Sequence, residues 1–263
     1  VLAEYGAEGA ELRGLWGVNI ADISDDHVNR AQKALRQHGL QVSCLASPFY
    51  KCDIAGASTT AAGRMHLASA RGYDQQLDLL RRLCDLADAF ETRFIRVFSF
   101  WKRGDLTEEI EQHIVDAFAR PLEIAAARNV TLLLENEHAC YLGTGAEIAR
   151  VIQKAGHPNL AACWDPGNAL AAHEVPYPDG YRAVRPFVKH VHIKDARIVD
   201  GEPRWCVVGE GVLDYRGQCA ALRADGYTGF VSLETHYVPQ GGTPEDGSRP
   251  CLEAINRLLK DTP

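Results

Sequence analysis

Short apolar segments alternate with amphipathic segments along nearly the whole chain. The apolar segments are residues 9–15, 40–47, 93–101, 130–137, 160–165, 188–195 and 229–237. They are almost continuously apolar and rich in Val, Ile, Leu and Phe, which is typical of strands covered on both faces. The helical periodicity between them gives a βαβα order, and this order requires a parallel sheet with right-handed crossovers.

Helices are expected over the segments that separate the strands. Their ranges are 27–38, 73–90, 108–128, 145–155 and 215–225, with a shorter helix over 181–186. Gly39 directly follows the first of these ranges, which is an ordinary helix stop. The opening residues, LAEYGAEGAEL, also resemble part of a helix.

Polar residues at the strand ends distinguish the two folds that have this order, the doubly wound open sheet and the (β/α)8 TIM barrel. An open sheet of the nucleotide-binding kind needs a glycine-rich phosphate turn after an early strand, and the sequence has none. A barrel carries its active site on the rim formed by the carboxyl ends of its strands. Four of the apolar segments end in or near ENE, WD, HIKD and ETH. We therefore predict a barrel that forms a single domain over residues 1–263.

The number of apolar segments is one fewer than the eight strands of such a barrel. We expect the first strand to lie upstream of residue 1, because the chain opens in what resembles the first helix and has no initiator Met. A seven-stranded barrel is the alternative.

Four strand-end residues can meet at one point of the rim. Side chains two apart in a strand share a face, and a barrel brings all its strand ends close together. The residues that this geometry can bring together are Glu135, Asp165, His192 and Glu234. Three buried carboxylates would repel one another and take up protons, and a divalent cation removes that conflict. Three oxygens and one nitrogen suit manganese, magnesium, cobalt or zinc (Mn²⁺, Mg²⁺, Co²⁺ or Zn²⁺), so we predict one such ion here.

Each ligand taken singly has a plainer alternative. An Asp before Pro-Gly, such as Asp165, often caps a turn or a helix, and a strand-end Glu often pairs with Arg or Lys. Four such residues, each at the end of its own strand, are harder to explain separately.

The sequence resembles the sugar phosphate isomerase/epimerase superfamily, the xylose isomerase-like TIM barrels. The likeness spans nearly the whole chain and is carried by EYGAEGAELR, GLQVSCLASPF, FIRVFSF, LLLENEH, CWDPGNA, HVHIKDA, VGEGVLDYRG and GYTGFVSLETHY. WDPGN with HIKD and a late LE is fairly specific for the superfamily and poorly specific for the substrate. In such proteins the metal ligands are the Glu of LEN, the Asp of WDPGN, the last His of HVHIKD and the Glu of SLE. These are the same four residues.

The expected activity is that of a metal-dependent isomerase or epimerase of carbohydrate metabolism, acting on a ketose, another sugar or a related hydroxy-ketone. The resemblance implies that Glu135 and Glu234 are catalytic and move protons on opposite faces of the substrate. A divalent ion would stabilise the enediolate that forms when a carboxylate removes the proton beside the carbonyl. The same residues suit a dehydratase for a sugar, an inosose or a dehydroshikimate-type compound. A non-catalytic sugar-binding barrel is the remaining alternative.

Two departures from the superfamily narrow the chemistry. The ketose 3-epimerases and abasic-site endonucleases that the sequence resembles carry a His where this chain has Asn168. Together with the net charge of -7, this argues against a nuclease, because nucleic-acid binding needs a basic surface. A hydride shift would need more carboxylates for a second metal, and Asp195 is isolated. We therefore expect proton transfer.

Further residues near the rim are candidates for substrate binding. They are Asn168, Lys194, His190, Glu137, Arg197 and Trp101. For Lys194, an ion pair with Glu210 is an equal alternative, and for His190 a place in the core is favoured. Glu137 could replace Glu135 as a ligand, although Glu135 lies nearer the apolar segment.

Three other features carry expectations about the region around the site. Arg96 is unusual inside an apolar strand, and we expect it to pair with a rim carboxylate. Residues 50–72 are rich in small side chains and follow a strand, which is typical of a lid over a barrel rim. Residues 197–214 are expected to fold back as a hairpin that turns at Asp200 and Gly201.

Composition supplies the remaining expectations. No segment approaches the ~20 apolar residues that cross a membrane, and the first residues are charged, unlike a signal peptide. The eight cysteines are scattered without a C-x-x-C pair, so we interpret them as core residues of a cytoplasmic protein. We expect a small-molecule sugar or polyol-ketone as the partner, with no nucleic acid and no membrane. The resemblance also implies a homodimer or a homotetramer.

Overall fold

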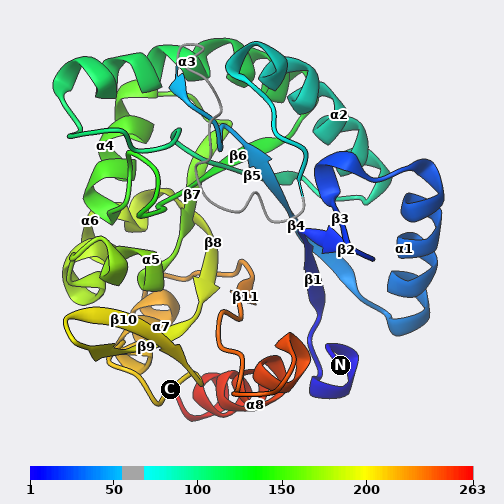
Figure 1. Cartoon of the computed structure of the whole chain (residues 1–263), viewed down its shortest axis with the longest axis vertical. Coiled ribbons are helices and arrows are strands. Elements are labelled where there is room, and N and C mark those ends of the chain that lie inside the picture. Colours follow the sequence, from blue (N-terminus) through cyan, green and yellow to red (C-terminus); the bar gives the residue numbers. More distant parts are fainter. Residues whose placement is uncertain (55–67, 263) are drawn as a thin grey trace.

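The computed structural model describes residues 1–54 and 68–262. A parallel sheet in the order β1-β4-β5-β6-β7-β8-β11 curves into a nearly closed barrel (Figure 1). Its strands are β1 (Gly9–Leu12), β4 (Gln41–Phe49), β5 (Phe94–Val97), β6 (Thr131–Glu135), β7 (Leu160–Trp164), β8 (Val188–Ile193) and β11 (Val231–Leu233). Each strand overlaps one of the seven predicted segments, so the predicted barrel is confirmed.

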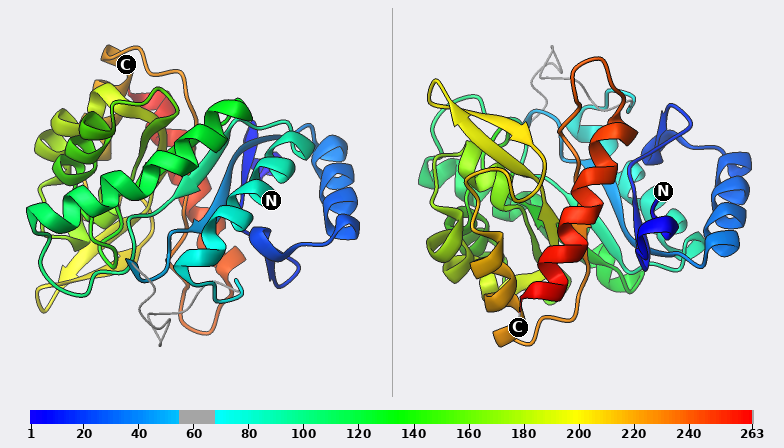
Figure 2. Two further views of the ribbon diagram at one scale, coloured as in Figure 1. Left: turned by 90° about the horizontal axis from the view of Figure 1, so that it is seen from above. Right: turned by 90° about the horizontal axis from the view of Figure 1, so that it is seen from below.

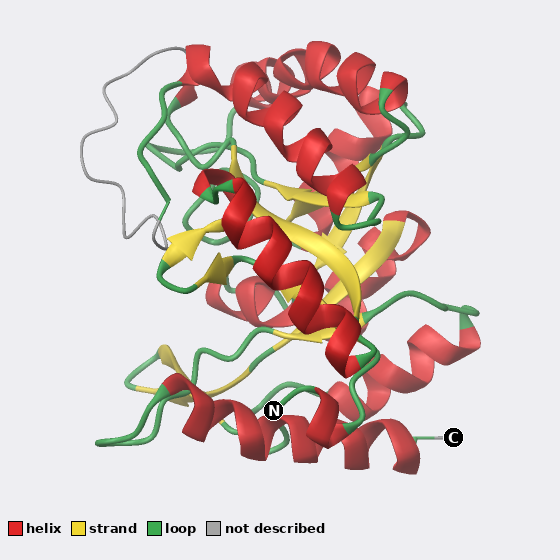
Figure 3. Ribbon diagram, turned by 90° about the vertical axis from the view of Figure 1, so that its right-hand side faces the viewer, coloured by secondary structure: helices red, strands yellow, loops and turns green. Residues whose placement is uncertain are grey.

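Helices surround this sheet, as Figure 3 shows with the strands in yellow inside the red helices. They are α1 (Asp25–His38), α2 (Gln76–Ala89), α3 (Glu108–Ala127), α4 (Gly145–Ala155), α5 (Pro166–Ala171), α6 (Tyr181–Val184), α7 (Tyr215–Ala224) and α8 (Pro244–Asp261). Short helical turns are η1 (Ala3–Tyr5), η2 (Ile20–Asp22), η4 (Tyr73–Gln75), η5 (Pro176–Gly180) and η6 (Arg185–Phe187). The predicted helices are confirmed to within a few residues at their ends, whereas α5 and α8 lie outside the predicted ranges.

The opening residues correct one expectation. A helix is predicted over LAEYGAEGAEL, but only η1 forms there, and β1 begins three residues after Gly6. Gly6 has a left-handed backbone with φ of 71°, and its N–H closes the turn onto the carbonyl of Ala3. The left-handed residue ends the turn, because a right-handed helix cannot continue through it.

The barrel is open between β1 and β11. These two strands form the ends of the sheet order, and among the described residues neither pairs with the other. Helix α8 packs against β11 and η1 on this side of the barrel (Figure 2). The strand count of seven agrees with the sequence, and the opening falls between the first and the last strand of the sheet.

Two antiparallel hairpins are attached to the barrel. They are β2 (Gly14–Leu15) with β3 (Val18–Asn19), and β9 (Asp195–Val199) with β10 (Glu202–Cys206). The second hairpin turns at Asp200 and Gly201, whose φ values of 55° and 81° suit a tight two-residue turn. This confirms the predicted hairpin. The predicted lid over 50–72 falls largely on residues 55–67, which lie outside the described residues.

The sheet buries side chains on both of its faces. Between the sheet and the helices lies one large apolar core, and inside the barrel lies a smaller cluster of Cys44, Leu133, Ala161 and Cys163. All eight cysteines are buried free thiols, as expected for core residues. Among the described residues, the helices are all too short or too polar to cross a membrane.

Candidate metal centre

The four predicted ligands lie together at the carboxyl-end rim of the barrel. Glu135 ends β6, Asp165 directly follows β7, His192 lies near the end of β8, and Glu234 follows β11. One oxygen of each carboxylate and one ring nitrogen of His192 all lie within 4.8 Å of one another. The strand ends thus bring three carboxylates and one imidazole to a single point.

The register of the parallel strands explains this convergence. Glu135 lies beside Cys163 of β7, and Cys163 lies beside His190 of β8. Asp165 and His192 are each two residues farther along their strands, so their side chains point to the same inner face, one step nearer the rim.

Asp165 is held by its backbone and by one of its two side-chain oxygens. Its N–H donates to Asn136 Oδ1 at 2.9 Å, and Asn136 Nδ2 donates to the carbonyl of Asp165 at 2.8 Å. Oδ1 of Asp165 accepts the N–H of Asn168 at 2.8 Å and caps α5. The helix-cap alternative is therefore correct for Oδ1, while Oδ2 faces the other ligand candidates.

The ring nitrogen Nδ1 of His192 faces all three carboxylates. It lies 3.3 Å from Glu135 Oε1, 3.4 Å from Asp165 Oδ2 and 3.9 Å from Glu234 Oε2. Glu135 is 1% exposed, and Asp165 and His192 are fully buried. Among the described residues, Glu135 Oε2 and Asp165 Oδ2 accept no hydrogen bond. Buried carboxylate oxygens without a hydrogen-bond donor fit a divalent cation, because a buried charged oxygen needs a partner of opposite charge.

Two buried cations balance part of this negative charge. Lys194 Nζ lies 2.7 Å from Asp165 Oδ2 and 2.5 Å from Glu234 Oε2. Arg96 Nη1 lies 3.2 Å from Glu135 Oε2 and 3.5 Å from Glu234 Oε1. The expectation that Arg96 pairs with a rim carboxylate is confirmed. The contacts to Glu135 Oε2 and Asp165 Oδ2 are ion pairs without hydrogen-bond geometry, which is why these atoms still lack a donor.

The pKa values follow from these charges. Burial alone would raise the pKa of Asp165 and of Glu234, but Lys194 and His192 together with other nearby positive groups outweigh it and lower both, that of Glu234 well below the usual range. Burial would likewise lower the pKa of Lys194, but Asp165 and Glu234 raise it. The two carboxylates and the ammonium are therefore ionised at neutral pH.

Two of the substrate-binding candidates contact the four proposed metal ligands. Asn168 Nδ2 donates to Glu135 Oε1 at 3.1 Å, and Lys194 makes the contacts above. Glu137 instead pairs with Lys51 at 3.0 Å and with His138 at 3.0 Å. The structure thus brings Glu135, and not Glu137, into the group of four.

The other candidates lie away from this group. Arg197 is on the exposed face of the β9–β10 hairpin, where it donates to Glu210 at 2.6 Å. The alternative of a Lys194–Glu210 pair is therefore wrong, because Lys194 turns inward and Arg197 takes that partner. Trp101 is buried, with Lys51 Nζ 5.4 Å from its ring.

Asp195 has a structural role. It is buried, and its side chain accepts the N–H groups of Ala196, Gly209 and Gly211 at 2.8, 2.9 and 3.0 Å. These bonds tie the chain after β10 to the end of β8. Its oxygens are thus engaged by backbone donors.

Several residues at the site are absent from the sequence-based prediction. Glu11 of β1 contacts His190 and His192, Arg13 lies 3.3 Å from Glu234 Oε1, and Asn136 fixes Asp165. The signal for Glu11 is the same as for Arg96, a charged residue on the inner face of an apolar strand. His190 is fully buried beneath the rim, in the core place that the sequence favoured.

Comparisons with known proteins agree with this architecture. A family model described as xylose isomerase-like TIM barrel matches residues 1–258. The chain is 22% identical over 198 residues to a 3-dehydroshikimate dehydratase of Bacillus anthracis, covering 75% of this chain and 65% of that protein. It is 24% identical over 163 residues to an inosose dehydratase of Geobacillus thermodenitrificans, covering 55% and 53%. The chain therefore spans less than two thirds of the length of either dehydratase. A 3-oxo-isoapionate decarboxylase of Pectobacterium atrosepticum is 24% identical over 222 residues, covering 78% of each.

Solved structures of similar fold include proteins with metals. The IOLI protein with a bound zinc atom has a TM-score of 0.75 at 15% identity, covering 99% of this chain and 91% of that chain. A Mycobacterium smegmatis barrel in complex with magnesium has a TM-score of 0.69 at 19% identity, covering 98% and 87%. An L-ribulose 3-epimerase has a TM-score of 0.71 at 19% identity, covering 98% and 86%. At these identities the likeness is one of fold.

Proposed function

From the premise that the chain belongs to the xylose isomerase-like TIM barrel family, we propose that it is a divalent-metal-dependent isomerase or epimerase. Its substrate is a ketose, another sugar or a related hydroxy-ketone. The observation that carries the proposal is the convergence of Glu135, Asp165, His192 and Glu234 within 4.8 Å. Two of these buried carboxylates have an oxygen without a hydrogen-bond donor among the described residues, and a divalent cation satisfies both.

The proposed ligands also position the groups that move protons. A divalent ion held by these residues would supply positive charge that stabilises the negative charge developing on the substrate. Glu135 ends β6 and Glu234 follows β11, and these strands are three places apart in the sheet order, so the two carboxylates approach a substrate from different sides. One carboxylate takes the proton beside the carbonyl, and the other returns a proton to the opposite face. Return to the same carbon gives epimerisation, and return to the neighbouring carbon gives isomerisation.

Neighbouring side chains fix these carboxylates. Glu135 accepts from Asn168 on one oxygen and faces Arg96 on the other. Glu234 lies between Lys194 and Arg13. Each carboxylate is thus held from two sides, which keeps it in place as a proton moves and avoids reorganisation during the reaction.

Aromatic and polar side chains beside Lys194 support a sugar-like substrate. The ring of Trp205, on the β9–β10 hairpin, lies 5.5 Å from Lys194 Nζ and 5.1 Å from the ring of His236. An aromatic face packs against the C–H groups of a sugar ring, while ammonium and amide groups bind its oxygens. We propose Lys194 and Asn168 for the second task.

The names of two relatives favour a second candidate, a dehydratase. The relatives named as 3-dehydroshikimate dehydratase and inosose dehydratase match more than half of this chain. A dehydratase begins with the same proton removal beside a carbonyl. It then expels the hydroxyl of the next carbon, which leaves as water after it gains a proton. The four residues serve this reaction equally well.

Turnover in deuterated water tests the proposal. The metal-loaded protein is incubated with a panel of ketoses, inososes and related hydroxy-ketones, and the products are analysed by mass and NMR. An epimerase or isomerase replaces a hydrogen of the reacting carbon by deuterium without loss of water, whereas a dehydratase yields a product that has lost one water. Clean turnover without label would indicate a hydride shift and contradict proton transfer.

Two variants test the role of the carboxylates in this experiment. Glu135→Gln and Glu234→Gln should keep some metal and lose label incorporation, since an amide oxygen can be a ligand but cannot take up a proton. Turnover near the wild-type rate in both variants would contradict the two-carboxylate mechanism. A protein that binds no metal and turns over no compound of the panel would fit the non-catalytic barrel instead.

A further inference from the structure

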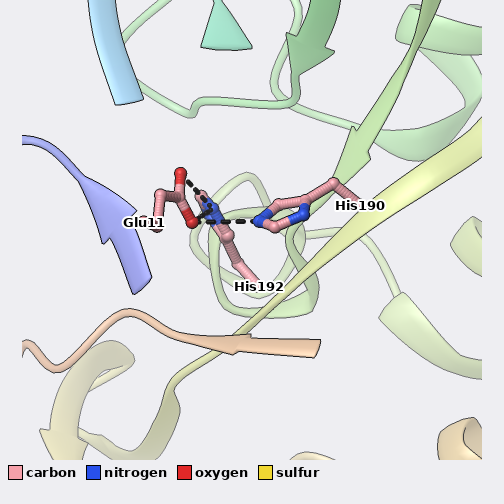
Figure 4. Close-up of side chains that lie close together, drawn as sticks. All are labelled: Glu11, His190 and His192. Carbon is pink, nitrogen blue, oxygen red and sulfur yellow. Dashed lines mark hydrogen bonds and ion pairs between the residues drawn. The ribbon is translucent and has the colours of Figure 1, made fainter. Parts of the chain in front are cut away.

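A second group of side chains lies in the barrel directly below the rim. Glu11 of β1 points at His190 and His192 of β8 (Figure 4). Oε2 of Glu11 lies 2.9 Å from His190 Nε2 and 3.0 Å from His192 Nε2, and Oε1 lies 3.2 Å from His192 Nε2. β11 comes between β1 and β8 around the barrel, so Glu11 reaches across the interior. One carboxylate thus binds two imidazoles.

The contacts of His192 show which of its nitrogens would keep its hydrogen beside a bound metal ion. A carboxylate only accepts hydrogen bonds, so the Nε2 that faces Glu11 is the N–H donor. Nδ1 points the opposite way, toward Glu135 Oε1 at 3.3 Å and Asp165 Oδ2 at 3.4 Å. Both nitrogens therefore face carboxylates and can carry hydrogen in the metal-free protein. A metal ion held by the four ligand candidates would displace the hydrogen of Nδ1 and leave the one on Nε2 in place.

His190 holds Glu11 in the position that makes this possible. Its Nε2 also donates to Glu11, and its ring meets that of His192 edge-on at 5.3 Å between centroids. Among the described residues, Nδ1 of His190 makes no hydrogen bond. Since both rings donate to Oε2 of Glu11, the carboxylate is fixed between two donors. His190 is fully buried, so water does not compete readily for it.

We infer that Glu11 is a positioning residue that fixes His192 with Nε2 protonated and Nδ1 as the ligand atom. The inference rests on the proposed metal site, and it adds a carboxylate–histidine–metal arrangement within that site. Such a carboxylate orients the ring and raises its basicity, and its loss typically weakens metal binding about 10- to 100-fold.

The nitrogen shifts of the wild-type protein test the inference without any variant. The protein is labelled with ¹⁵N-histidine and loaded with zinc, and long-range proton–nitrogen spectra are recorded. We expect Nδ1 of His192 to be zinc-bound and Nε2 to carry a slowly exchanging proton. Zinc bound through Nε2 would overturn the inference. If the wild type binds no zinc, both the metal site and the inference that rests on it fail.

Zinc affinity in variants supplies the second measurement. Glu11→Gln keeps the size of the side chain, but its amide can accept from only one ring through oxygen. We expect about 10- to 100-fold weaker zinc binding by competition with a chelator, and faster exchange of the Nε2 proton of His192. Glu8→Gln, at an exposed residue just before β1, is the matched control and should bind zinc like the wild type. His190→Phe, which removes one donor to Glu11, should show a smaller loss and serves if Glu11→Gln does not fold.

The outcomes separate the inference from the proposed function. If the wild type binds zinc and Glu11→Gln binds it equally well, the metal site stands and the positioning role is wrong. A second zinc ion per chain that is lost in Glu11→Gln, with the first retained, would also overturn the role. In that case the three side chains would be a metal site of their own.

Discussion

Replacing Lys194 by Met should weaken the metal-free fold and strengthen the binding of a divalent ion. Nζ of Lys194 lies 2.7 Å and 2.5 Å from oxygens of two proposed ligands, Asp165 and Glu234, and its side chain is 2% exposed. Removing one partner of a buried ion pair costs about 3 to 5 kcal/mol. We expect about 3 kcal/mol, because Arg96 and Arg13 still face Glu234. For a chain of this size that is a fall of about 6 °C in Tm.

The gain in metal affinity comes from the same contacts. A metal ion and the ammonium compete for the same two oxygens, and the charge-assisted hydrogen bond from Lys194 to Glu234 is worth about 1.5 to 3 kcal/mol. If only the smaller value is recovered, binding of Mn²⁺ to Lys194→Met tightens by about tenfold. Calorimetric titration with Mn²⁺ measures this affinity, and thermal unfolding in a chelator measures the stability.

A second buried lysine provides the matched control. Lys51 pairs with Glu137 at 3.0 Å and is 8% exposed at its side chain, but it contacts none of the four proposed ligands. Lys51→Met should lose comparable stability and bind Mn²⁺ like the wild type. If Lys194→Met binds Mn²⁺ more weakly than Lys51→Met does, the hold of Lys194 on the ligands outweighs its competition with the metal ion, and the competition argument is refuted.

Two further changes test the surroundings of the site. Glu137→Gln should lose about 3 kcal/mol at neutral pH, because it leaves Lys51 buried without a partner. His138 and Lys51 outweigh burial and lower the pKa of Glu137 well below 4.5, so this contribution is complete above pH 4.5 and disappears as the pH falls through the lowered value. Urea unfolding of the wild type and of Glu137→Gln from pH 7 to pH 3 should show the difference between their free energies of unfolding becoming smaller. A constant difference would contradict the assignment. Asn136→Ala removes both hydrogen bonds to the backbone of Asp165 and should lose about 3 kcal/mol of stability and about tenfold in Mn²⁺ affinity, whereas unchanged affinity would show that Asp165 does not need this support.

The strands and the four ligand candidates were predictable for related reasons. A strand covered on both faces is apolar almost throughout, so a carboxylate or imidazole at its end stands out. Arg96 stands out in the same way, and the structure gives it the expected carboxylate partners. The sheet has seven strands, one fewer than the eight of a closed barrel of this kind, and it is open between β1 and β11.

Other features depend on contacts that no local pattern reveals. Helix α8 contains Gly247 and Pro250, which are typical of a loop. A Cβ on Gly247 would lie 1.9 Å from the carbonyl oxygen of Tyr237, so glycine allows the helix to approach that backbone. Glu11 is a charged residue in an apolar segment, like Arg96, but the opening residues around it also resemble part of a helix, and this obscured the signal. The role of Asn136 appears only when the backbone of Asp165 lies beside it.

Anomalous diffraction from crystals of the protein grown or soaked with Mn²⁺ tests the central claim most directly. The account predicts one manganese peak per chain at the carboxyl-end rim. We expect oxygens of Glu135, Asp165 and Glu234 and the Nδ1 atom of His192 to lie within ~2.0–2.4 Å of it. A peak elsewhere, or no peak at these four residues at saturating Mn²⁺, would contradict the account.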